Sequence, residues 1–321
     1  MSAPAPRPST ASAAAETYRV TPGYALLAAA SAILFSAKAV VVKLAYAHGS
    51  IAHPVDPITL LTLRMVFALP FFAAVGWWSI AREGALPLTR RDHGLIIMLG
   101  LLGYYFSSYM DFIALQYISA ALERLILYLY PTLVLLISVF FLRHRVTRRH
   151  VVALAISYAG ILLVFGHDLH IAVDQRSVVL GAFFVLLSSV SYAVYLVVGG
   201  EVIKRAGPTR FTAYVLTVSC IACVAHFLVV NPLSALDLPV AIYGYSVTIA
   251  VFSTVVPSFM IALAIKRIGV NNVSVIGAAG PLATIALGAL LLGERINAWQ
   301  LAGALLVIAG VLTITIKPRA S

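Results

Sequence analysis

Ten apolar runs of about 20 residues follow one another along the chain and leave little sequence for a soluble domain. A run of this length crosses a bilayer as a helix, and a helix satisfies its own backbone hydrogen bonds in lipid. The mean hydropathy of +1.01 and the charged fraction of 10% exclude an ordinary water-soluble protein. We therefore predict an all-α integral membrane protein with ten transmembrane helices. The predicted spans are 23–47, 57–79, 94–115, 118–142, 149–166, 178–200, 209–230, 241–265, 270–292 and 297–316.

Lysine and arginine residues are distributed unevenly between the two sides of these spans. If the N-terminus is cytoplasmic, sixteen of the 22 lie in cytoplasmic segments, and only Arg176 and Arg295 lie outside. This bias predicts a multi-pass protein of the cell (inner) membrane with both termini in the cytoplasm. The net charge of +11 therefore reflects topology, and nucleic acid is not an expected partner.

The two halves of the chain repeat a pattern. Pro131 in the fourth span matches Pro281 in the ninth, and Gly160 in the fifth matches Gly310 in the tenth. A repeat of five spans enters the membrane from the opposite side, because five is odd, so we predict two inverted five-helix repeats. The expected units are a disordered cytoplasmic tail at 1–22, a first repeat at 23–166, a second repeat at 178–316 and a cytoplasmic tail at 317–321.

Pro131 and Pro281 are expected in the middle of their helices. Proline lacks the backbone N–H and its ring clashes with the preceding turn, so each is predicted to kink its helix. Two interpretations stay open: a kink that only improves packing, or a hinge that lines a cavity.

Six ionisable residues fall inside apolar spans, all in the first half and in the predicted outer half of the bilayer. A charge in hydrocarbon is costly unless it faces a partner or water, so these residues predict a transport pathway or a buried network. They are Lys38, Lys43, Arg64, Asp111, Glu123 and Arg124.

Polar side chains also recur at helical spacing, which predicts polar stripes in the third, fourth and sixth spans. Such stripes suit an aromatic-lined cavity for a carboxylate or phosphate group, with or without an amino group beside it. Lys38 is the first candidate for the anion contact and Arg124 the second. The candidate substrate-binding residues are Lys38, Arg124, Tyr128, Tyr104, Ser108, Tyr192 and Tyr195.

A structural interpretation of the same residues stays open. Arg64 would pair with Asp111, and Arg124 with Glu123 or Asp111, while Lys43 snorkels to the interface. Tyrosine stripes are also common in ordinary packing. The sequence favours this interpretation for Arg64 and Lys43, and ligand binding for Lys38. Arg64, Asp111 and Glu123 are therefore assigned to a charge network or to coupling.

No metal or other cofactor is expected. Cys220 and Cys223 form a CxxC spacing inside a span, where two small apolar side chains are the simpler interpretation. A predicted outer loop carries His167, Asp168, His170 and Asp174, which a solvated polar loop explains as well as a metal site does.

Several ordered motifs resemble those of the drug/metabolite transporter superfamily, specifically proteins with two EamA-type domains. They are FSAKAVVVK, DPITLLTLRMVF, FIALQYISAALERL, YPTLVLLISVFFLRHR, SYAVY and GPLATIALGALLLGER, and the resemblance covers residues 23–316. It implies ten helices, a central cavity between the repeats and alternating-access movement of small metabolites, often outward. Lys38, Asp111, Glu123 and Arg124 depart from the residues usual at their positions, which leaves the substrate open. Lys43, Arg64 and Glu294 agree with the common pattern.

The predicted function is secondary active transport, most simply export, of a small anionic or zwitterionic metabolite such as an amino acid or organic acid. The protein is not expected to be an enzyme, and no GxxxxGK[ST] loop for nucleotide hydrolysis is present. The alternatives are a multi-pass membrane enzyme acting on a lipid-linked substrate and an exporter of cationic drugs or metabolites. A buried carboxylate can carry a proton, and Glu123 and Asp111 are the candidates for proton coupling, although nearby cations favour permanent ion pairs.

Overall fold

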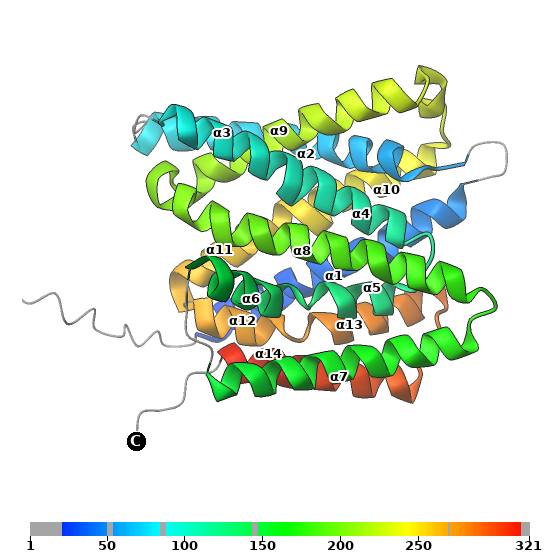
Figure 1. Cartoon of the computed structure of the whole chain (residues 1–321). Coiled ribbons are helices and arrows are strands. Elements are labelled where there is room, and N and C mark those ends of the chain that lie inside the picture. The colour runs from blue at the N-terminus through cyan, green and yellow to red at the C-terminus, as the bar shows by residue number, and fades with distance from the viewer. Residues whose placement is uncertain (1–20, 50–53, 84–87, 143–146, 269, 316–321) are drawn as a thin grey trace, which may run out of the picture.

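A computed structural model describes residues 21–49, 54–83, 88–142, 147–268 and 270–315 (Figure 1). The described chain is helical throughout, apart from turns and short connections. The two predicted tails lie outside the described residues, except for residues 21 and 22.

The first half of the chain supplies five spans, of which the third and fourth are composite. Its elements are α1 (Pro22–His48), α2 (Pro57–Glu83), α3 (Arg90–Leu99), the π-helix η1 (Gly100–Phe106), α4 (Ser107–Ala114), α5 (Ala120–Leu127), α6 (Tyr130–Leu142) and α7 (Arg148–Ile171). The third span runs through α3, η1 and α4 without a break, whereas a turn separates α5 from α6 in the fourth.

The second half follows the same plan. Its elements are α8 (Gln175–Ala206), α9 (Pro208–Val230), the short 3-10 helix η2 (Leu233–Leu236), α10 (Val240–Ala250), the π-helix η3 (Val251–Val255), α11 (Val256–Ile268), α12 (Val270–Gly277), α13 (Gly280–Leu287), the π-helix η4 (Gly288–Leu292) and α14 (Ala298–Thr315). Within the described ranges, nine helical stretches are long and apolar enough to cross a membrane, and α14 carries a shorter apolar stretch. The prediction of an all-helical membrane protein is confirmed.

Helix α1 lies at the centre of the bundle, where it packs against α10, α11, α12, α13 and α5. At one edge α7 pairs with α14, and α2 pairs with α9 near the opposite edge (Figure 1). The first helices of the two halves, α1 and α8, run in opposite directions in this view. The start of α1 and the end of α14 lie at the same, left-hand end of the molecule, as an even number of spans requires.

The close pairing of α7 with α14 depends on glycine. A Cβ added to Gly160 would lie 2.7 Å from the carbonyl oxygen of Gly303 and 2.8 Å from Cβ of Leu306. Any side chain there would push the two backbones apart, so Gly160 allows α7 and α14 to pack closely.

The predicted outer loop after the fifth span is partly helical, which corrects the sequence prediction. Helix α7 continues to Ile171, so His167, Asp168 and His170 lie on its last turns. The helix continues because Leu169 still packs against a buried apolar cluster. Asp174 caps α8 instead, with its carboxylate accepting the backbone N–H of Arg176 at 3.0 Å.

Both predicted kinks are breaks in the helix. In the fourth span a turn at 128–129 precedes α6, and Pro131 is the second residue of that helix. In the ninth span a turn at 278–279 precedes α13, and Pro281 is again the second residue. Each proline therefore stands at the start of a new helix, where its missing N–H is tolerated, and the two halves are interrupted at matching positions.

Candidate functional site

Lys38 joins three elements of the first half. Its ammonium group on α1 lies 2.6 Å from Oδ2 of Asp111 on α4 and 3.8 Å from Oε1 of Glu123 on α5. Glu123 is completely buried and the Asp111 side chain is 2% exposed, while that of Lys38 is 16% exposed. Asp111 and Glu123 of the predicted network lie together around Lys38, and Lys38 rather than Arg64 is the ion-pair partner of Asp111.

The two carboxyl groups are not balanced by this one ammonium. Among the described residues, no donor reaches Oδ1 of Asp111 or either carboxylate oxygen of Glu123 within hydrogen-bond distance, and all three atoms are buried. The two carboxyl groups are close enough to interact directly. Buried polar atoms without a partner are costly, so the site accommodates one more positive charge, either a proton or the ammonium group of a ligand.

Arg124 is the neighbouring cation and is only partly engaged. Its Nη2 donates to Oγ of Ser36 at 3.3 Å, and its guanidinium lies 5.4 Å from the ring centroid of Tyr128. Its Nε is buried, and no acceptor lies within hydrogen-bond reach in the part of the chain that the structure describes. Arg124 thus has donor capacity left for an anion.

Arg64 is buried and contacts hydroxyl groups rather than a carboxylate. Its Nε donates to Oγ1 of Thr254 at 3.3 Å and its Nη1 to Oγ of Ser108 at 3.4 Å. Its guanidinium also lies 5.7 Å from the ring centroid of Phe112. These contacts tie α2 to η3 of the second half, so Arg64 connects the halves.

The four candidate tyrosines form one chain of ring contacts. Tyr104 lies 5.3 Å from Tyr195, and Tyr195 lies 5.7 Å from Tyr192, as measured between ring centroids. Tyr130 then links Tyr192 to Tyr128, with centroid distances of 5.5 and 6.3 Å. This series of tyrosine rings ends at Tyr128, whose ring lies against the guanidinium of Arg124. Sequence reasoning missed Tyr130, although its place two residues from Tyr128 on the same helix break could have suggested it.

The two helix breaks meet at a polar junction. The hydroxyl of Tyr128, at the first break, donates to the carbonyl oxygen of Gly277, at the second. Oγ of Ser36 on α1 donates to the carbonyl oxygen of Gly280 at 3.0 Å. The sequence did not predict a role for Ser36, Gly277 or Gly280. No local pattern marks a serine hydroxyl or a glycine carbonyl that forms a hydrogen bond with a distant helix.

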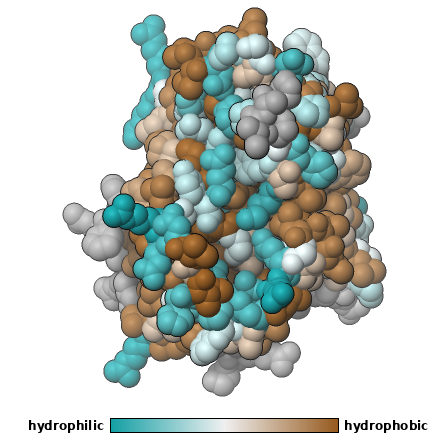
Figure 2. Space-filling model, turned by 90° about the vertical axis from the view of Figure 1, so that its right-hand side faces the viewer, coloured by the Kyte–Doolittle hydropathy of each residue, from teal (hydrophilic) through white to brown (hydrophobic). Residues whose placement is uncertain are grey.

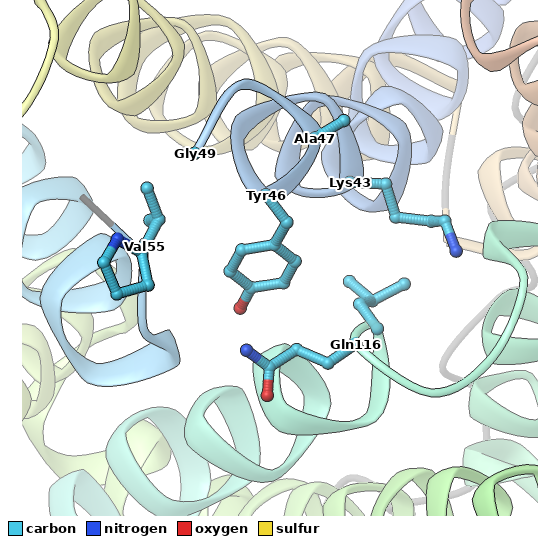
Figure 3. A pocket seen from close by; sticks show the side chains of 8 residues that line it. Lys43, Tyr46, Ala47, Gly49, Val55 and Gln116 are labelled. Atoms are coloured by element: carbon cyan, nitrogen blue, oxygen red, sulfur yellow. The ribbon is translucent and has the colours of Figure 1, made fainter. Parts of the chain in front are cut away.

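A cavity of about 550 Å³ opens at the end of the molecule that lies on the right in Figure 1, the predicted outer end (Figure 3). Figure 2 looks onto this end and shows hydrophilic residues between hydrophobic ones across the face. The hydroxyl of Tyr46 points toward Gln116 and donates to the carbonyl oxygen of Phe112 at 2.9 Å. Leu115 lines the cavity, and its backbone N–H donates to the carbonyl oxygen of Asp111 at 3.2 Å, so the cavity lies about one helical turn from the buried charges.

Lys43 lines the same cavity but its ammonium points away from Tyr46 (Figure 3). It donates to the carbonyl oxygen of Ile118 at 2.8 Å and lies 3.8 Å from Oε1 of Glu294 in the second half. Lys43 therefore joins the two halves at the predicted outer end.

Cys220 and Cys223 are buried thiols on α9, where they belong to a cluster of packed apolar residues. Within the described ranges, no group of three or more His, Cys, Asp or Glu residues is arranged to hold a metal ion.

An all-helical membrane bundle in two halves, with charged and aromatic side chains buried where the halves meet, has the architecture of a secondary transporter. The model of the EamA-like transporter family matches residues 23–166 and 179–316, and the chain belongs to this family.

Two relatives are transporters of Bacillus subtilis. The chain is 31% identical to the uncharacterized transporter YcbK of Bacillus subtilis over 281 residues, covering 84% of this chain and 86% of YcbK. It is 27% identical to the uncharacterized transporter YyaM of the same organism, over 70% and 73% of the two chains. A solved crystal structure of a protein shares the fold with a TM-score of 0.62, at 18% identity, over 92% of this chain and 97% of the other.

Proposed function

We propose that this protein exports a small zwitterionic metabolite, such as an amino acid, by alternating access between its two halves. One observation carries the proposal: carboxylate oxygens without donors lie beside an arginine whose Nε has no acceptor, among the described residues. The ligand ammonium would meet Asp111 and Glu123, and the ligand carboxylate would meet Arg124. An anionic organic acid, which uses only the arginine, is the second choice.

Contacts between α1 and α5 hold the negative charge of Glu123 and the positive charge of Arg124 close together. Glu123 and Arg124 are adjacent on α5, and they face Lys38 and Ser36, which are two residues apart on α1. A ligand with both charges close together, as in an α-amino acid, fits this spacing. The tyrosine chain that starts at Tyr128 provides rings and hydroxyl groups beside it.

Proton exchange is the proposed driving reaction. Asp111 and Glu123 share the ammonium of Lys38 from α1, while Arg124 follows Glu123 on α5 and Arg64 from α2 adds a more distant positive charge. The carboxylate oxygens that lack donors among the described residues offer the same site to a proton and to a ligand ammonium. Binding of one would favour release of the other.

The proposed orientation is supported by the sequence. The excess of basic residues at one end supports cytoplasmic termini and an inner-membrane location. Outward transport rests on the family resemblance alone.

One observation favours a second candidate, export of a cationic metabolite. The unpaired carboxylate oxygens and the tyrosine chain also suit an organic ammonium ion. A lipid-linked enzyme has less support, because the acidic residues are buried among helices rather than placed in an interfacial loop.

Uptake into proteoliposomes tests the proposal. Radiolabelled alanine, glutamate, succinate and choline would be compared with and without an imposed pH gradient. We expect alanine to be transported best, and Arg124→Gln to raise its half-saturating concentration by about tenfold, because a charge-assisted hydrogen bond is lost. Arg90→Gln, at an exposed position at the start of α3 and at the opposite end of the bundle, is the matched control.

The substrate class is wrong if choline alone is transported, which supports the cationic candidate, or if succinate is transported and alanine is not. Proton exchange is wrong if transport is the same with and without the gradient.

A further inference from the structure

The carbonyl group of Gly277 has lost its usual partner within the helix. In a continuous helix the N–H four residues later would bond to it, but that residue is Pro281, which has no N–H. The hydroxyl of Tyr128 takes this place and donates to the Gly277 oxygen. A side chain from the first half thus satisfies the backbone group that proline leaves open in the second.

Tyr128 itself stands at the corresponding break of the first half, at the turn that precedes α6. The breaks of the two halves are therefore joined by one hydrogen bond. Gly280 leaves room for it, because a Cβ at this position would collide with the Tyr128 hydroxyl and lie 3.3 Å from Oγ of Ser36. The bond therefore depends on a glycine in the second half and on a tyrosine in the first.

Arg124 is held on both parts of this junction. Its guanidinium lies over the Tyr128 ring, and its Nη2 donates to Ser36, which in turn donates to the carbonyl oxygen of Gly280. An anion that engages Arg124 competes with these contacts. Binding of an anion would then weaken the contact of Arg124 with Tyr128 and its hydrogen bond to Ser36, and so affect both helix breaks.

We propose that Tyr128 is a positioning residue that couples occupancy at Arg124 to the angle between the two broken helices. The Tyr128–Gly277 hydrogen bond holds the breaks together in the state described by this structure, and it opens when the halves move during transport. The link to occupancy rests on the proposed function, whereas the bond between the breaks does not.

Tyr128→Phe removes the hydroxyl and keeps the ring under Arg124. Tyr130→Phe is the matched control, because it removes a hydroxyl from the same helix break. Spin labels at Gln116 and Ile296 report on the predicted outer end of the two halves, and labels at Arg91 and Lys266 report on the other end. All four positions are exposed. The background carries Cys220→Ala and Cys223→Ala.

Distance distributions in lipid nanodiscs, without any ligand, are the measurement. We expect Tyr128→Phe to change the ratio of the two conformational populations by about fivefold. The Tyr128–Gly277 hydrogen bond forms only in the state described by this structure, so its removal destabilises that state and leaves the other unchanged. Tyr130→Phe should leave the ratio unchanged. Arg124→Gln should shift it in the same direction, and the double variant should shift it by less than the product of the two single effects.

Gly280→Ala gives an independent test, because the added methyl group displaces the hydroxyl. It should shift the populations as Tyr128→Phe does, and it covers the case in which that variant fails to fold. The proposal is overturned if Tyr128→Phe matches the parent protein, if Tyr130→Phe shifts the ratio equally, or if the effects of Arg124 and Tyr128 multiply. These measurements use no substrate, so their outcome does not depend on whether alanine is transported. A failure of the alanine assay would not contradict the spin-label result, and success in that assay would not replace it.

Discussion

The ammonium group of Lys38 lies 2.6 Å from the carboxylate of Asp111, and this pair connects α1, at the centre of the bundle, with α4. Glu123 approaches the same ammonium from α5 at 3.8 Å. The two carboxylates are almost fully buried and the lysine is mostly buried, so their charges are poorly screened and each depends on the others. Changes at one member should therefore affect both stability and transport.

Asp111→Asn should lower the stability of the protein by about 3 kcal/mol, because it leaves the buried ammonium of Lys38 without its nearest countercharge. Thermal unfolding in detergent measures the effect. The triple variant Lys38→Met, Asp111→Leu and Glu123→Gln removes all three charges and should recover much of the loss. If the triple variant is less stable than Asp111→Asn alone, the three side chains stabilise the fold by more than the compensation of their charges.

The apolar runs predicted the spans well, because crossing a membrane is a local requirement that each segment meets by its own composition. The partner of Asp111 was not predicted, since Lys38 is 73 residues away and several cations had similar depth. Which of them reaches Asp111 depends on how α1 sits among its neighbours. The π-helix at 100–106 was likewise missed, because a regular spacing between Tyr104, Ser108 and Asp111 assumes an unbroken α-helix.

The two helix breaks were only half predicted. Pro131 and Pro281 marked them correctly as matched interruptions, because the missing N–H is a local property. That Tyr128 would satisfy Gly277 could not be deduced, since this requires the relative placement of two helices from different halves. The sequence therefore indicates which types of residue form the site, but it does not indicate which of these residues contact each other.

Gly160→Ala should lower stability by about 1 to 3 kcal/mol, because the new methyl group would meet the backbone of Gly303 on α14. Gly166→Ala on the same helix is the control, since nothing lies within 4 Å of its added Cβ. That change should be neutral or stabilise by up to about 1 kcal/mol through helix propensity. Equal losses in thermal stability for the two variants would contradict close packing at Gly160.

Pro281→Ala should make the ninth span more continuous, because the new N–H can bond to the Gly277 carbonyl four residues earlier. Backbone amide hydrogen exchange in the segment 277–285 should become slower. Pro22→Ala, at the first position of α1, replaces a proline whose N–H would have no helical partner and should leave exchange nearly unchanged. Faster exchange in 277–285 would show that the proline stabilises the break rather than causing it.

A further contact between the halves lies at the end of the bundle opposite the cavity. Nε of Arg205 on α8 donates to Oδ1 of Asp92 on α3 at 3.0 Å, and Asp92 also forms a capping box with Thr89. The Asp92 side chain is 2% exposed, whereas that of Arg205 is 52% exposed. The capping box stabilises α3 alone, but the arginine connects α3 to the other half.

These two roles of Asp92 can be separated. Thr89→Ala should cost about 1 kcal/mol of stability through loss of the cap and leave the relation between the halves intact. Arg205→Gln should cost at most about 1 kcal/mol, because the arginine is half exposed, yet it removes a bond that must break whenever this end opens. A cysteine introduced at Ile96, which is buried in the apolar cluster between α3 and α8, should therefore react faster with a membrane-impermeant maleimide in Arg205→Gln than in Thr89→Ala. Equal labelling rates would mean that this ion pair does not restrain the opening of the bundle.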